Sequence, residues 1–328
     1  MNRRKQRLAL ACPTLSEALT RYTAEVSSQK KGSAQERSIA NVWRRTLLSG
    51  RRLNRITQAD IQALRDRWLQ DRAPATVTRR LALLSHVYTV AAKDWGIPGL
   101  QNPVALVRWP QTDNARDRRI FDRITHRGIP ASECPRSELE WIIRCTRSRS
   151  LPTIVLLAVE TGMRRSEIVG LTRQQVDMTT GVITLTETKN GRIRYVPLSP
   201  FAKDELRRHL ADRPMRGRVF DVSASAVSQA FARAVNKSRR RYEAMCEQHS
   251  RKPRDHYFRD LHFHDLRHES ASRLASVFQA ADLAKVTGHR STRMLLRYYH
   301  PHGRDLARKL ARSTLGRRQA AILRASAT

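Results

Sequence analysis

Side chains that can bind a phosphate, carry a proton or attack phosphorus are spread over the second half of the chain. They are Arg164, Lys189, His264, Arg267, His289 and Tyr298. Guanidinium and ammonium groups stabilise phosphate oxyanions, imidazoles move protons near neutral pH, and a deprotonated tyrosine is a nucleophile. Each residue taken singly is more commonly a surface charge or a core residue, so only the combination favours phosphoryl transfer.

The first arginine follows a glycine that allows a sharp turn. Gly162 precedes a predicted helix whose N-terminus would favour a phosphate, and we expect Arg164 in its first turn. Lys189 stands beside Asn190-Gly191, a dipeptide typical of a β-hairpin turn. A lysine in such a turn can reach into a cleft as an acid.

A second motif, Phe263-His264-Asp265-Leu266-Arg267-His268, pairs a proton carrier with a phosphate clamp. His264 and Arg267 are three residues apart and share one helical face, and His268 lies four residues after His264. A metal site built on these two histidines is not favoured, because no carboxylate or cysteine lies nearby at ligand spacing. We therefore expect neither a metal ion nor a cofactor.

The last motif contains two adjacent tyrosines, Tyr298 and Tyr299. Neighbours on a helix point about 100° apart, so only one of them can face a phosphate.

The order of these motifs resembles that of the tyrosine recombinases, or phage integrases. The shared elements are an arginine after Thr161-Gly162, a hairpin lysine, His-x-x-Arg, Gly288-His289, and a tyrosine nine residues after that histidine. This spacing selects Tyr298. The sequences of 187–191, 264–269 and 288–291 look most like those of shufflon-type DNA invertases and related integrases.

The resemblance implies that Tyr298 attacks DNA, leaving a 3′-phosphotyrosyl bond and a free 5′ hydroxyl. Lys189 would protonate the departing 5′ oxygen, and His264 would assist proton transfer at the tyrosine. The phosphotyrosyl bond stores the energy for rejoining, so neither ATP nor a metal is needed.

The same resemblance assigns phosphate binding to Arg164 and Arg267, which would hold the non-bridging oxygens. His289 would hydrogen-bond the phosphate, and Glu167 would support the region of Arg164. The expected function is site-specific DNA recombination: integration, excision or inversion of mobile DNA. Neither the target sequence nor the choice among these outcomes follows from the sequence.

The composition agrees with a nucleic-acid partner. The 328 residues include 63 Lys and Arg against 29 Asp and Glu, a formal net charge of +34. Such a charge repels itself unless a polyanion is near. No stretch approaches the roughly 18 apolar residues of a membrane span. The four cysteines have no zinc-site spacing, and a reducing compartment fits them.

The resemblance adds expectations about partners. Strand exchange implies a homotetramer on paired sites of double-stranded DNA, with DNA-bending accessory proteins as further candidate partners. The expected location is the bacterial cytoplasm, in association with the nucleoid, and no membrane partner is expected.

Hydrophobic periodicity predicts a mainly α protein with a small antiparallel β-sheet. We expect a basic tail over 1–13, a helical core-binding domain over 14–109, a linker over 110–119, and a mixed α+β catalytic domain over 120–328. Predicted landmarks are a buried helix at Leu151–Glu160, a hairpin at Val182–Tyr195 and a helix over 291–299. In the first domain, Thr57 and Asp60 have the spacing of a capping box, before a helix whose apolar face contains Ile61, Leu64, Trp68 and Leu69. The helix that starts at Pro74 is predicted to turn Leu81, Leu84, Val87, Tyr88 and Ala91 inward.

Two segments leave alternatives open. The basic stretch 236–259 is predicted as irregular, either a DNA-contacting loop or an insertion. The C-terminal stretch from Leu306 to Leu323 is a basic helix that docks either on a neighbouring protomer or on its own domain.

Three rival functions deserve a test. A catalytically silent DNA-binding regulator would keep the fold without the chemistry. A type IB topoisomerase shares the chemistry but needs no specific site. A metal-dependent transposase or nuclease would need clustered acidic ligands.

Overall fold

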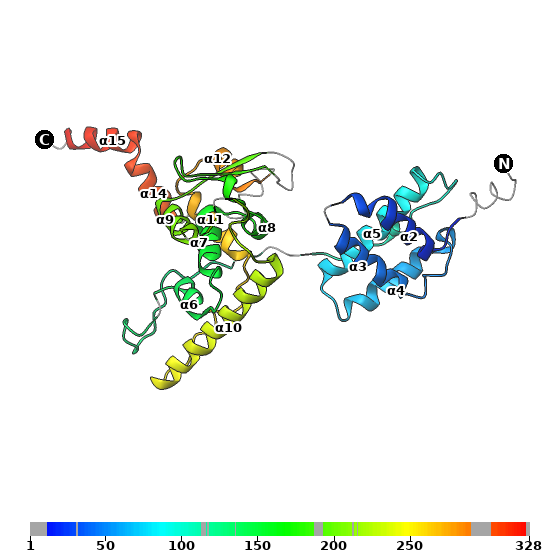
Figure 1. The fold of residues 1–328 in the computed structure, drawn as a ribbon, viewed down its shortest axis with the longest axis horizontal. Helices are drawn as coiled ribbons and strands as arrows, with labels where there is room; N and C mark the ends of the chain where they lie inside the picture. The colour runs from blue at the N-terminus through cyan, green and yellow to red at the C-terminus, as the bar shows by residue number, and fades with distance from the viewer. Residues whose placement is uncertain are drawn as a thin grey trace. The chain divides into compact units, whose positions relative to one another are not determined.

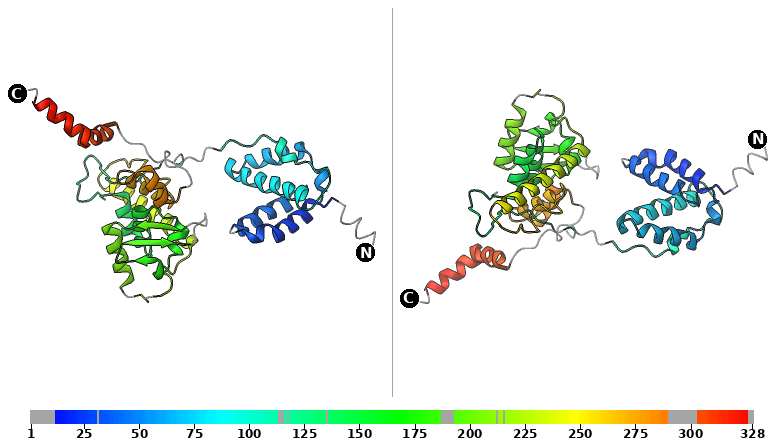
Figure 2. Two further views of the ribbon diagram at one scale, coloured as in Figure 1. Left: turned by 90° about the horizontal axis from the view of Figure 1, so that it is seen from above. Right: turned by 90° about the horizontal axis from the view of Figure 1, so that it is seen from below.

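The computed structural model describes residues 12–30, 32–112, 116, 118–134, 136–186, 193–211, 213–214, 216–289 and 303–325. The chain divides into two compact units, Met1–Ala115 and Arg116–Thr328. Helices dominate both, and the second also contains a small antiparallel sheet (Figures 1 and 2). This agrees with the predicted secondary-structure class. None of the described helices is long and apolar enough to cross a membrane.

The first unit consists of helices joined by short turns. Its helices are α2 (Leu15–Glu25), α3 (Ser33–Arg44), α4 (Gln58–Leu69) and α5 (Pro74–Lys93), with 3-10 turns η1 (Ser27–Gln29), η2 (Leu53–Arg55) and η3 (Pro103–Leu106). The predicted capping box at the start of α4 is present, because the Thr57 hydroxyl accepts from the Asp60 N–H and the Asp60 carboxylate accepts from Thr57.

The core of the first unit is built around aromatic side chains. The ring of Trp43 meets that of Trp68 edge to face at 4.8 Å, and its Nε1 donates to the Arg80 carbonyl at 3.0 Å. The apolar face predicted for α5 is buried as expected. Leu69 was predicted to face inward with Ile61, but it is 36% exposed because α4 ends there.

The second unit carries more elements, in the following order. They are α6 (Glu138–Cys145), α7 (Leu151–Thr161), α8 (Arg165–Val169), η4 (Arg173–Gln175), β1 (Val176–Asp177), β2 (Val182–Leu185), β3 (Arg194–Pro197), α9 (Pro200–Leu210), α10 (Ala224–Gln248), α11 (Asp265–Leu274), α12 (Ala280–Thr287), α14 (Gly303–Arg312) and α15 (Thr314–Ala325).

The sheet confirms the strands of the predicted hairpin. Strands β2 and β3 pair antiparallel, with Val182 opposite Pro197 and Leu185 opposite Arg194. The predicted turn residues Asn190 and Gly191 lie outside the described residues. Strand β1 adds a short third strand that was not predicted, and α12 packs on β3.

Helix α7 is the central element of the second unit. Its predicted burial is confirmed, and it packs against α9 and α11. All four cysteines of the chain are free and buried. The predicted C-terminal helix is interrupted at Ser313, where α14 gives way to α15, and the helix predicted over 291–299 lies outside the described residues.

The prediction of an irregular segment over 236–259 is wrong for its first half, because α10 continues to Gln248. Apolar residues such as Phe231, Tyr242 and Cys246 keep a helical spacing on its buried face. Arg239 occupies that face as well, donating to the carbonyls of Arg254 and Tyr257 at 2.6 and 2.9 Å. Because an arginine occupies a buried position, the apolar periodicity of this helix is interrupted in the sequence, and the helix was not predicted.

Substitution of Tyr242 tests whether the second half of α10 is packed. We expect Tyr242→Ala to lower the free energy of unfolding by about 3–5 kcal/mol, the usual cost of removing a large buried aromatic. The neighbouring Arg241 is exposed, so Arg241→Ala should change it by no more than about 0.5 kcal/mol. Urea unfolding measures both, and equal small effects would contradict a packed helix.

Candidate active site

Two helix C-termini supply the carbonyl groups around which the site is built. The C-cap of helix α7 is Gly162 (φ 63°) and that of α12 is Gly288 (φ 70°), both in the left-handed conformation. A side chain at Gly288 would also collide with the guanidinium of Arg194. Glycine is therefore required at this close approach, and both helices end with their last carbonyls available to donors.

Arg267 joins these two helix ends. Its guanidinium donates to the carbonyl of Gly162, and to that of Thr287 at 2.5 Å. Arg267 is only 6% exposed. The negative ends of two helix dipoles thus hold a buried cation in place.

Arg164 is fixed differently from the prediction. It is the N-cap of α8, one residue before the helix, and its backbone N–H donates to Glu167 at 2.7 Å. The side chain pairs with Glu167 at 2.8 Å and donates to the Gly288 carbonyl at 3.1 Å. The guanidinium is therefore held at the C-terminal end of α12.

Arg194 is a site residue that sequence reasoning missed. It donates to the Thr287 carbonyl at 2.9 Å and pairs with Glu167 at 2.5 Å. Burial acts to raise the pKa of Glu167, but Arg194 and Arg164 hold it below its ordinary value. Its position on β3 could have identified it, because Arg194 shares the buried face of the strand with Val196. A charged side chain on a buried face needs a partner.

His289 reaches the same cluster. Its Nδ1 lies 2.6 Å from the Thr287 hydroxyl, which donates to the Leu283 carbonyl at 2.6 Å. The hydroxyl proton is thereby used, so Nδ1–H must be the donor and Nε2 the acceptor, 3.4 Å from Arg267. Burial, followed by the guanidiniums of Arg267 and Arg164, lowers the pKa of His289 to about 4.

His264 stands at the start of α11, with its ring 4.9 Å from that of His268. Desolvation and then the guanidinium of Arg267 lower the pKa of His264, with a smaller contribution from Arg164. Burial and then His264 lower the pKa of His268 to about 4. Both imidazoles are therefore neutral at pH 7.

The structure thus brings Arg164, Arg267 and His289 together and places His264 within electrostatic reach of both arginines. A cavity of about 940 Å³ adjoins the cluster and is lined in part by Arg164, Arg194 and His289. Lys189, Tyr298 and the neighbouring Tyr299 lie outside the described residues.

The described residues hold no group of three or more His, Cys, Asp or Glu side chains that could bind a metal ion. In the described part of the cluster, Arg164, Arg194 and Arg267 supply positive charge, and Lys285 also lines the adjoining cavity. Guanidinium groups bind phosphate through paired, directed N–H donors.

Comparison with known proteins gives consistent matches. A model of the phage integrase family matches residues 138–304. The shufflon-specific DNA recombinase of Escherichia coli is 36% identical over 309 residues, which cover 90% of this chain and 71% of that protein.

Solved structures match in fold. A Tn1549 transposon integrase in complex with a circular intermediate DNA has a TM-score of 0.66 at 16% identity, covering 91% of this chain and 99% of that chain. A lambda integrase tetramer bound to a Holliday junction has a TM-score of 0.63 at 20% identity, covering 91% and 81%.

The neutral histidines predict a loss of stability in mild acid. Below pH 6.5 the unfolded chain protonates His268 and His289, whereas the folded site excludes these protons until about pH 4. The free energy of unfolding should fall as the pH is lowered from 6.5 to 5. His268→Gln should flatten this slope relative to the wild type. Urea titrations at each pH give the slopes, and equal slopes for the wild type and the variant would be inconsistent with a desolvated His268.

Proposed function

Because the chain belongs to the phage integrase family and is a site-specific tyrosine recombinase, we propose that Arg164, Arg267 and His289 bind the phosphate at which it cuts DNA. The enzyme breaks and rejoins DNA through a 3′-phosphotyrosyl intermediate. The assignment of these steps to individual residues is the proposal.

One observation carries the assignment. Arg164 and Arg267 donate to the adjacent carbonyls of Gly288 and Thr287, and His289 is the next residue in the chain. Donors fixed in advance stabilise charge that develops in a transition state without having to reorganise. Glu167, shared by Arg164 and Arg194, keeps the arginines in place before DNA arrives.

The proposed cleavage step conserves protons. The Tyr298 oxygen forms a bond to phosphorus while the bond to the 5′ oxygen breaks. His264, neutral at pH 7, accepts the tyrosine proton, and Lys189 gives one to the leaving oxygen. Rejoining runs the same transfers in reverse, so no ATP is consumed. Arg164 and Arg267 supply the positive charge that metal ions supply in other phosphoryl-transfer enzymes.

DNA binding beyond the cut site is proposed from exposed charge. Arg233, Lys237, Arg240 and Arg241 lie exposed on α10. Contacts from such residues to backbone phosphates give affinity that falls steeply with salt. We assign core binding to the helical first unit.

The assembly and the outcome are also proposals. A lambda integrase of similar fold forms a tetramer on a Holliday junction, which supports a homotetramer on paired sites. Similarity to a shufflon-specific recombinase favours inversion among the outcomes. DNA-bending accessory proteins and a nucleoid-associated, cytoplasmic location remain predictions.

The nucleophile is tested with a nicked suicide duplex that carries the flanking repeat. Wild type in EDTA should form a covalent protein–DNA complex on a denaturing gel, Tyr298→Phe should form none, and Tyr299→Phe should form it. Loss with Tyr299→Phe instead would move the nucleophile by one residue. Tight binding without any complex would favour the silent regulator.

The role of Arg164 is tested by rate. We expect Arg164→Ala to slow covalent-complex formation about 10²-fold or more, the usual cost of losing one fixed donor, with little change in DNA affinity. The matched control is the adjacent, exposed Arg165, which donates to Ser228. Arg165→Ala removes the same charge and should cleave near the wild-type rate. Equal rates for the two variants would remove Arg164 from the site.

A further inference from the structure

The chain enters the second unit through a segment that carries three arginines, Arg116, Arg118 and Arg119. We call Arg116 and residues 118–121 the strap. Each of these arginines ends on a carboxylate whose side chain is no more than 2% exposed. A basic segment expected to be a linker therefore has its charge paired with buried carboxylates of the second unit.

Two of the three carboxylates belong to α11. Arg116 binds Asp265 through two hydrogen bonds of 2.9 Å each, one to each carboxylate oxygen. Arg119 binds Glu269 at 2.9 and 3.4 Å, and the backbone N–H of Ile120 donates to the same carboxylate at 3.3 Å. Bidentate pairs of this kind fix orientation as well as distance.

The strap and the active site hold different faces of α11. Asp265 and Glu269 are four residues apart and share one face. Arg267 is two residues from each, so it points about 200° around the helix axis from both. Its guanidinium reaches the ends of α7 and α12, while the opposite face is held by the strap.

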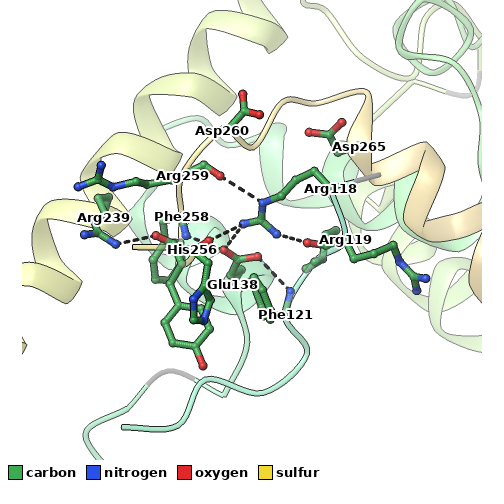
Figure 3. A network of polar contacts seen from close by, with 12 residues as sticks. Arg118, Arg119, Phe121, Glu138, Arg239, His256, Phe258, Arg259, Asp260 and Asp265 are labelled. Atoms are coloured by element: carbon green, nitrogen blue, oxygen red, sulfur yellow. Dashed lines mark hydrogen bonds and ion pairs between the residues drawn. The ribbon is translucent and has the colours of Figure 1, made fainter. Parts of the chain in front are cut away.

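The third ion pair, Arg118 with Glu138, lies in the same segment but does not involve α11. Arg118 binds Glu138 at 2.5 Å, and that carboxylate also accepts from the backbone N–H groups of Phe121 and Phe258 (Figure 3). Glu138 is in α6, so this pair anchors the strap without touching α11. The three pairs are alike in charge and in the burial of the carboxylate, but they differ in which helix they hold.

We propose that Arg116 and Arg119 are positioning residues for DNA cleavage, which set the placement of α11 and thereby of His264 and Arg267. The inference rests on the proposed function of those two residues. Neither Arg116 nor Arg119 touches the reacting atoms, and they act through Asp265 and Glu269. A displacement of about 1 Å in a catalytic group is enough to slow a reaction about 10²-fold.

The test uses the full chain with Arg116→Ala, Arg119→Ala and the matched control Arg118→Ala. Hydrogen exchange in free protein follows the amides of α11 and α7, and a suicide duplex at saturation gives the rate constant of covalent-complex formation. We expect the first two variants to speed exchange in α11 but not α7, and to cleave about 10²-fold more slowly at unchanged DNA affinity. Arg118→Ala should keep the wild-type exchange in α11 and the wild-type rate constant.

The kinetics of the variants distinguish a loss of folded protein from a displacement of α11. Partial unfolding lowers the amplitude of complex formation, whereas misplacement lowers its rate constant. Arg116→Lys and Arg119→Lys keep the charge and lose the two-pronged geometry, so they should fold and still cleave more slowly than wild type. Equal α11 exchange, or equal rate constants, across all three alanine variants would overturn the inference. The exchange measurement needs no DNA, so an inactive wild type would count against the proposed function alone and leave the exchange data to decide on the strap.

Discussion

Guanidinium groups bound to the carbonyl ends of α7 and α12 are the interaction on which the second unit's site depends. Arg164, Arg194 and Arg267 bring three positive charges to the carbonyls of Gly162, Thr287 and Gly288, and one carboxylate, Glu167, offsets part of that charge. The negative ends of two helix dipoles supply the remaining acceptors. This arrangement is available only because both helices end in a left-handed glycine, which leaves the last carbonyls free of a continuing helix.

Burial, together with the charges around it, sets the state of the histidines. Desolvation is the largest cause that lowers the pKa values of His289 and His268 to about 4, followed by the guanidinium of Arg267 for His289 and by His264 for His268. The protein therefore concentrates permanent positive charge where a phosphate is expected and keeps its proton carriers neutral. Such a site is less stable than an apolar core of the same size, because part of its charge is left for the ligand to neutralise.

Local patterns predicted much of this from sequence. The Thr57 capping box, the burial of α7, the two hairpin strands and the order of the site motifs all follow from short-range spacing. What the patterns missed depends on partners distant in sequence. Arg194 and Arg239 are buried arginines whose acceptors lie 93 and 15 residues away. The strap pairs lie up to 150 residues apart, so no local period reveals them. The roles of Lys189 and Tyr298, outside the described residues, still rest on motif spacing.

The strap also decides where the second unit can be cut away from the rest of the chain. A boundary at residue 120, which the sequence suggests, would remove Arg116, Arg118 and Arg119 and so take one arginine partner from each of three carboxylates that are at most 2% exposed. Removing one partner of a buried ion pair costs several kcal/mol, and less at Glu269, where Arg273 remains as a second partner. A fragment beginning a few residues earlier would retain every pair. The second unit therefore starts before the arginines, and what composition marks as a spacer is, in folding terms, its first structural element.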